Sequence, residues 1–249
     1  MGNLGGITLK EVIVFQTQLM MGAQFGRITK MDASQDDLII ACLRMGWNDA
    51  FRHTSENTKE GEHSILELEE KEWRKNHKEE YDDFICGKIL NEPVVLDTYK
   101  KFVTQKTTAG KIQIIENKWN DLKKLFRVYK TISGDKQLCF GHFQKMFNIA
   151  TKLYVCLYVC KQELGICADK FDSEIIKNIQ YADCPIDSII LKKLSEQTNT
   201  NYNNQKWSKY GTANHKTENY KEIQETISSL DVTDKKSKLY YDFIAWKQA

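Results

Sequence analysis

The chain has 249 residues, 41% hydrophobic and 11% aromatic, enough to bury a core in one large helical domain or two small ones. Its 36 basic and 34 acidic residues give a formal net charge of +2, which excludes a strongly basic nucleic-acid-binding chain and confines any basic surface to one region. Only 2 prolines and 13 glycines occur, without alternating β-branched runs, so the sequence predicts an all-α protein.

The seven cysteines make an odd number in a long chain, and no two of them form a Cys-x-x-Cys pair. The sequence contains no signal peptide and no apolar run long enough to cross a membrane. These features predict free thiols, packed as small hydrophobic side chains, in a cytoplasmic protein without a membrane partner.

The first third of the chain predicts two helices and a charged connection. One helix is expected around Val12–Met21. Ser34 can cap a second helix, whose first turn has Asp36 and Asp37 at the positive end of the helix dipole. Apolar residues follow at helical spacing over about five turns. The highly charged stretch Glu56–Glu80 then predicts a solvated connection and one exposed helix.

The middle of the chain predicts two helices separated by a break. Pro93 is expected to end an element, and Asp97–Lys106 to form a short helix. Thr107–Gly110 predicts a break before a strongly amphipathic helix over Ile112–Tyr129. One side of that helix is basic and lies next to aromatic residues, so it either meets phosphate groups or is simply solvated. The basic residues are Lys118, Lys123, Lys124, Arg127 and Lys130.

The stretch over residues 140–194 contains the residues that could carry chemistry. Its first helix is expected over His142–Cys160, with an apolar side at helical spacing. The apolar residues are Phe143, Met146, Phe147, Ala150, Leu153, Tyr154 and Leu157. Lys145, Asn148 and Lys152 fall on the other side. A lysine there is either exposed to solvent or set into a cleft, where burial lowers its pKa and makes the neutral amine a nucleophile.

A second helix of this stretch is expected to begin at its Cys-Pro-Ile-Asp segment. Pro185 suits the first turn of a helix and Asp183 is a candidate cap, which places Asp187 within the first turn. There the carboxylate either complements the helix dipole or stands at the mouth of a cleft, ready to activate water or to face a developing cation.

Beyond the second helix, the sequence predicts a long loop and two further elements. Residues 195–211 are expected to form a loop whose length suggests a function, and it contains Trp207 and Lys209. A helix is expected over Asn219–Ser229, followed by an aromatic-rich closing piece over Lys238–Trp246.

Lys145, followed by Ile149, Ala150 and Lys152, and a later Pro-Ile-Asp ending at Asp187 together make a recognisable pattern. The pattern resembles the helix–hairpin–helix superfamily of DNA glycosylases, and it is most similar to the divergent archaeal 8-oxoguanine DNA glycosylase branch. The glycine-rich hairpin that usually precedes the lysine in that superfamily is absent. The resemblance implies a compact, two-lobed helical fold with a cleft between the lobes.

The resemblance also implies an activity. Such enzymes flip a damaged or hypermodified base out of the DNA duplex and cut its N-glycosidic bond, leaving an abasic site. In this chain Lys145 would attack the sugar and Asp187 would assist; if Lys145 only binds substrate, Asp187 would direct a water instead. A monomer acting on DNA, without cofactor or metal, is expected. Damaged cellular bases would indicate base-excision repair, and hypermodified bacteriophage bases would indicate antiphage defence.

A flipped base needs aromatic walls, and the DNA strand needs cationic contacts. The candidate contacts are Trp207, Lys209, Tyr210, Lys152, Gln144 and Trp47, with Trp246 as a further aromatic candidate. For each aromatic residue the alternative is ordinary packing in the core or in a loop.

Two other classes of protein stay open on the sequence. A non-enzymatic helical interaction module would use the C-terminal aromatic residues, and it predicts that Lys145 and Asp187 are far apart or fully exposed. A metal-dependent hydrolase would use a cluster of cysteine and histidine ligands. Its candidate ligands are His142, Cys156, Cys160, Cys167 and Cys184.

Overall fold

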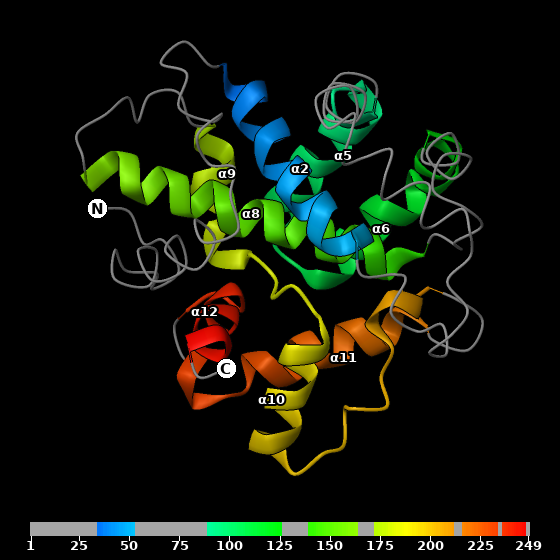
Figure 1. Cartoon of the computed structure of the whole chain (residues 1–249), viewed down its shortest axis with the longest axis vertical. Helices are drawn as coiled ribbons and strands as arrows, with labels where there is room; N and C mark the ends of the chain where they lie inside the picture. Colours follow the sequence, from blue (N-terminus) through cyan, green and yellow to red (C-terminus); the bar gives the residue numbers. More distant parts are fainter. Residues whose placement is uncertain are drawn as a thin grey trace, which may run out of the picture.

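The computed structural model describes residues 34–52, 89–125, 139–163, 172–211, 216–233 and 236–247. Over these residues the protein is all-α, as the composition predicts, and contains no strand (Figure 1). The elements expected at Val12–Met21 and Glu56–Glu80 lie outside the described residues. No helix within the described ranges is long and apolar enough to cross a membrane.

Helices from distant parts of the sequence surround one long central helix. The earlier ones are α2 (Gln35–Arg52), α5 (Pro93–Thr104), α6 (Thr108–Asn117) and α8 (Phe140–Glu163). The later ones are α9 (Ser173–Asn178), η5 (Ile179–Tyr181), α10 (Ser188–Thr198), η6 (Trp207–Lys209), α11 (Thr217–Ser228), η7 (Asp231–Thr233) and α12 (Leu239–Lys247). Figure 1 shows α8 across the middle, with α2 and α5 above it, α6 to its right, and α10, α11 and α12 below it.

Helix α8 is buried on nearly all of its sides. From Cys139 to Leu157, every residue except Ile149 is buried. A helix buried all round belongs to the centre of a protein rather than to its surface. The polar residues of α8 must therefore find partners inside the protein, because a buried polar group without a hydrogen bond is costly.

Helix α2 begins where the sequence predicts. The hydroxyl of Ser34 accepts a hydrogen bond from the backbone N–H of Asp37 at 3.2 Å, and the carboxylate of Asp37 accepts one from the N–H of Ser34 at 2.8 Å. This reciprocal capping satisfies amides that the first turn of a helix leaves free. Asp36 pairs with Lys100 of α5 at 2.6 Å, which links the two helices.

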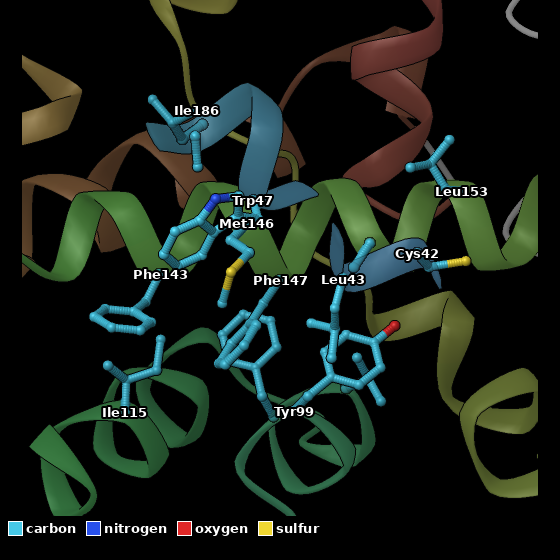
Figure 2. Packing of buried hydrophobic residues seen from close by; sticks show 14 of the residues in the cluster. Cys42, Leu43, Trp47, Tyr99, Ile115, Phe143, Met146, Phe147, Leu153 and Ile186 are labelled. Carbon is cyan, nitrogen blue, oxygen red and sulfur yellow. The ribbon is translucent and has the colours of Figure 1, made fainter. Parts of the chain in front are cut away.

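Helices α2 and α8 cross in close contact. A Cβ atom at Gly46 would lie 2.2 Å from the backbone oxygen of Met146, so only glycine allows this approach. Aromatic rings fill the other side of α8, with Tyr99 and Phe147 at a centroid distance of 5.6 Å. Figure 2 shows Tyr99, Phe143 and Phe147 in the space between α8 and the α5 and α6 ribbons.

The expectations for α5 and for the start of α6 were wrong. Pro93 begins α5 instead of ending an element, because proline fits the first helical turn, where its missing N–H has no partner to lose. Helix α6 begins at Thr108, inside the expected break. Its cap is Thr107, whose side chain accepts a hydrogen bond from the N–H of Gly110 at 3.1 Å.

The single helix expected over Ile112–Tyr129 is interrupted within the described residues. Helix α6 ends at Asn117, Lys118 leaves helical geometry at φ −105° and ψ 7°, and a second helical stretch covers 119–125. Trp119 then makes an edge-on contact with Phe143 of α8, with ring centroids 5.7 Å apart.

A second group of buried residues joins the C-terminal half of α8 to α12. Its members are Val155, Cys156, Val159, Ile179, Ala182, Leu239, Tyr240 and Phe243. The N–H of Leu239 donates to the carbonyl of Ala182 at 3.2 Å, so α12 is held next to the segment that leads into α10. The main buried cluster includes residues from α2 through α12, and the division into two lobes stays a prediction.

Candidate functional site

A buried, extended segment leads from η5 into α10, and we call residues 182–187 the strap. All six of its residues are buried, and Pro185 within it lacks a backbone donor. Buried backbone groups require hydrogen-bond partners, and two glutamine side chains supply them. Gln144 of α8 pairs with both backbone groups of Ile186, and Gln224 of α11 pairs with both backbone groups of Cys184.

The second helix of the 140–194 stretch begins later than the sequence predicts. Asp187, not Asp183, is the N-cap of α10, and its carboxylate accepts a hydrogen bond from the N–H of Ile190 at 2.9 Å. Pro185 therefore lies two residues before the cap, in the extended strap. The reason is tertiary, because the backbone on either side of Pro185 is held by glutamines from other helices.

Asp183 has a different role from the expected cap. Its buried carboxylate accepts hydrogen bonds from Thr108 at 2.9 Å and from Tyr220 at 3.1 Å, and it pairs with Lys238 at 2.5 Å and with Lys111 at 3.4 Å. Burial opposes ionisation of Asp183, but the two lysines and these hydrogen bonds outweigh it and lower its pKa. Asp183 thus ties the strap to α6, α11 and the start of α12.

Asp187 is only 7% exposed, at the positive end of α10. Burial raises the pKa of its carboxyl group. The positive charges of Lys145 and Lys152 and the hydrogen bond from the Ile190 N–H act to lower this pKa, and the negative charge of Asp49 acts to raise it. The charge of Lys145 therefore acts on the candidate aspartate, while the ion pair of Lys145 is with Asp49. Both the helix end and the lysine favour the ionised form that burial disfavours.

Lys145 is buried, although its place on the helix also allowed a solvent-exposed side chain. Its Nζ lies 2.9 Å from the carboxylate of Asp49 on α2, and the two side chains are 5% and 40% exposed. The ring centroid of Trp207 lies 4.6 Å from the same Nζ, which is a cation–π contact. Lys145 thus lies among a partly exposed carboxylate, an indole ring and the cap of α10.

Two turns along α8, Lys152 forms a second ion pair. Its ammonium pairs with the carboxylate of Asp242 on α12, and the rings of Phe243 and Trp246 lie 5.2 and 5.7 Å from the same Nζ. Burial raises the pKa of Asp242 to about 6, with Lys152 lowering it and Asp187 and Asp49 raising it. The second pair is therefore electrostatically connected to the first.

We call these five residues the charge cluster: Asp49, Lys145, Lys152, Asp187 and Asp242. When all are ionised, three carboxylates face two ammonium groups, which leaves one negative charge in excess. Sequence reasoning identified the two lysines and Asp187. It missed Asp49 and Asp242, because neither belongs to a local motif and only the packing of α2 and α12 on α8 brings them to the site.

The other candidate contacts fall into buried and accessible sets. Trp47 is 1% exposed in the core, and Tyr210 is buried. The side chain of Gln144 is buried too and is hydrogen-bonded to the strap. Trp207 is half-buried and Lys209 is exposed. Of these residues, Trp207 and Lys209 are the ones that an external ligand could reach.

Trp207 is held against the beginning of α8. A Cβ atom at Gly141 would lie 1.8 Å from the backbone oxygen of Trp207, and the N–H of Gly141 donates to the carbonyl of Tyr210 at 3.1 Å. The ring of His142 meets the Trp207 ring edge-on, with centroids 6.0 Å apart. The glycine therefore sets the position of the indole over Lys145.

The candidate metal ligands lie in separate places, as far as the structure describes them. Nδ1 of His142 is 3.0 Å from the thiol of Cys139, while Cys156 and Cys184 are buried free cysteines. The side chain of Cys160 and the whole of Cys167 lie outside the description. Among the described residues, no three His, Cys, Asp or Glu side chains come together as a metal site.

Comparison with known proteins adds no family to this picture. No family model, no curated protein and no solved structure matches the chain.

Proposed function

We propose that this protein is a DNA glycosylase that hydrolyses the N-glycosidic bond of a damaged or hypermodified base. The observation that supports the proposal is the burial of Lys145 and Asp187 on two segments that hydrogen bonds between the preceding residues, Gln144 and Ile186, hold together. The interaction-module alternative expects these side chains to be exposed or far apart. Their burial instead favours a role in chemistry, because buried ionisable groups of opposite charge are typical of functional sites.

The chemistry needs a carboxylate in this position. When the bond between C1′ and the base nitrogen breaks, its electron pair leaves with the base and positive charge develops on the sugar. The Asp187 carboxylate stabilises that charge electrostatically. Water then adds to C1′, and its proton passes to Asp187 and from there to the departed base anion, so an abasic site and a neutral free base are the products and the carboxylate is restored.

The lysine offers a second route to the same abasic site. In its neutral form, the amine of Lys145 attacks C1′ and displaces the base, and opening of the sugar gives an imine that water hydrolyses. The ammonium must first lose a proton, and Asp49 is the carboxylate closest to it, at 2.9 Å. The two routes differ in whether a covalent intermediate can be trapped.

When all five of its members are ionised, the charge cluster has one excess negative charge, which supports the same proposal. A cationic sugar would balance this charge at the moment when the bond breaks. Trp207 and Lys209 lie on the accessible side and supply a ring for base stacking and a cation for the DNA backbone.

The test is base release. Purified protein is incubated with duplex and single-stranded DNA carrying damaged or hypermodified bases, and abasic sites are measured. Wild type should produce abasic sites on at least one base, and Asp187→Asn should lose them. Lys192→Gln, which alters an exposed lysine of α10, is the matched control and should keep full activity.

Borohydride separates the two routes. Trapping of a protein–DNA adduct in wild type but not in Lys145→Gln would establish attack by the amine. Abasic sites without trapping would establish hydrolysis by water. An absence of abasic sites on every base would contradict the proposal, and measured DNA binding would then decide whether an interaction module remains. The class of base that is released would distinguish repair from antiphage defence.

A further inference from the structure

We propose that Gln144 is a positioning residue, which ties the strap bearing Asp187 to the helical turn that carries Lys145. For its effect on catalysis this inference rests on the proposed function. Its structural part does not, because it concerns how the distance between a lysine and an aspartate is maintained.

The hydrogen bonds of Gln144 carry the argument. Its Nε2 donates to the carbonyl of Ile186 at 3.0 Å, and its Oε1 accepts from the N–H of Ile186 at 3.2 Å. Gln144 directly precedes Lys145, and Ile186 directly precedes Asp187. One side-chain amide therefore connects the two peptide segments that bear the candidate pair.

Asp183 and Gln224 hold the first half of the strap, and Gln144 holds the backbone next to Asp187. The six residues of the strap are buried and belong to no helix or strand, its ends at Ala182 and Asp187 have extended backbone angles, and Pro185 contributes no N–H. The side-chain amide of Gln144 gives the strap one hydrogen-bond donor and one acceptor, as a neighbouring β-strand would. The strap has no neighbouring strand among the described residues. Asn148, one turn further on, donates to Oε1 of Gln144 at 3.4 Å and to the hydroxyl of Tyr220 at 2.9 Å, which orients the amide.

Gln224 provides a matched control within the same protein. Its Oε1 accepts from the N–H of Cys184 at 3.0 Å and its Nε2 donates to the carbonyl of Cys184 at 2.6 Å. Both glutamines are fully buried. Gln224 belongs to α11, which carries no member of the charge cluster, so its loss removes equivalent bonds without releasing Lys145 from Asp187.

The decisive measurement is the titration of the Asp187 carboxyl carbon by ¹³C NMR, assigned by its disappearance in Asp187→Asn. Because Lys145 lowers the pKa of Asp187, Lys145→Met should move its titration midpoint to higher pH. In a Gln144→Met background the same substitution should move the midpoint much less. In a Gln224→Met background, Lys145→Met should move the titration midpoint of Asp187 as far as it does in wild type.

Equal movement of the midpoint in all three backgrounds would overturn the inference. Gln144→Leu also removes both bonds to Ile186 without adding a charge, and it repeats the comparison if Gln144→Met does not fold, as judged by circular dichroism. This result is independent of activity, so a wild type that releases no base contradicts the proposed function alone.

Where base release is detected, kinetics extend the test. Gln144→Met should lower kcat by about 10-fold to 100-fold, since a displacement on the order of 1 Å has effects of that size. KM should change by less than about twofold, because contacts with the unreacted substrate are kept. Gln224→Met should retain kcat, and a comparable loss of kcat in that control would count against a specific role for Gln144.

Discussion

Lys152 of α8 and Asp242 of α12 form an ion pair in which the side chains are only 4% and 1% exposed. The two residues lie 90 positions apart in the chain, and α12 reaches α8 through the second buried cluster. Removal of water weakens the screening of this pair and also makes each charge costly if its partner is lost. Substitutions in this pair therefore test how much the packing of α12 on α8 contributes to stability.

Breaking the Lys152–Asp242 pair should destabilise the fold strongly. Asp242→Leu takes both the counter-charge and its hydrogen-bond acceptor away from the buried ammonium of Lys152, and Lys152→Met takes the counter-charge away from the carboxylate, so each should lower the free energy of unfolding by about 3–5 kcal/mol. The double variant Lys152→Met/Asp242→Leu removes both charges and should recover most of that loss. Urea unfolding of the four proteins forms the cycle, and additive losses in the double variant would contradict a direct pair.

The stability of the protein should depend on pH through Asp242. Burial raises its pKa from the usual 3.8 to about 6, despite Lys152, with Asp187 and Asp49 also facing it. The folded state therefore binds a proton more readily than the unfolded state, and ionisation of Asp242 opposes folding above about pH 6. Relative to Asp242→Asn, wild type should gain stability as the pH falls from about 7 to about 5. A difference in unfolding free energy that stays constant over this range would argue against the raised pKa.

Asp187→Asn should fold at least as well as wild type. The asparagine oxygen can still accept the hydrogen bond from Ile190, so the cap of α10 is kept. The substitution also removes a carboxylate whose ionisation burial disfavours, as its raised pKa indicates. Thermal unfolding at neutral pH should show no loss of stability. Asp187→Ala, which removes the cap, should instead lose about 1 kcal/mol. A large loss in Asp187→Asn would show that its charge stabilises the fold.

Gly46→Ala should disrupt the crossing of α2 and α8. The added methyl group would lie 2.2 Å from a backbone oxygen, which no side-chain rotation can relieve, and overpacking of this kind costs about 1–3 kcal/mol or more. Gly110→Ala is the control, because the closest atom there is the flexible end of Gln105, at 2.7 Å. That variant should stay within about 1 kcal/mol of wild type, since alanine also favours a helix. Chemical denaturation measures both, and equal effects would rule out a special role for Gly46.

Local features of the sequence were enough to predict the fold class and several helices. The scarcity of proline and glycine indicates an all-α protein, and Ser34 caps α2 as expected, because helix propensity and capping act between residues only a few positions apart. The spacing of apolar residues likewise placed a helix on the stretch that became α8. Lys145 and Asp187 were singled out from the same stretch, and both are buried in the structure.

What surrounds those residues was decided by tertiary structure alone. The polar side of α8 could have faced water, but the strap and α12 cover it and bury Lys145 and Lys152. Asp187 became the cap of α10, and Pro185 stayed extended, because Gln144 and Gln224 hold the strap from other helices. Such bonds join residues about 40 positions apart, so no local pattern records them. They form only when packing brings the helices together and removes the alternative of hydrogen bonding to water.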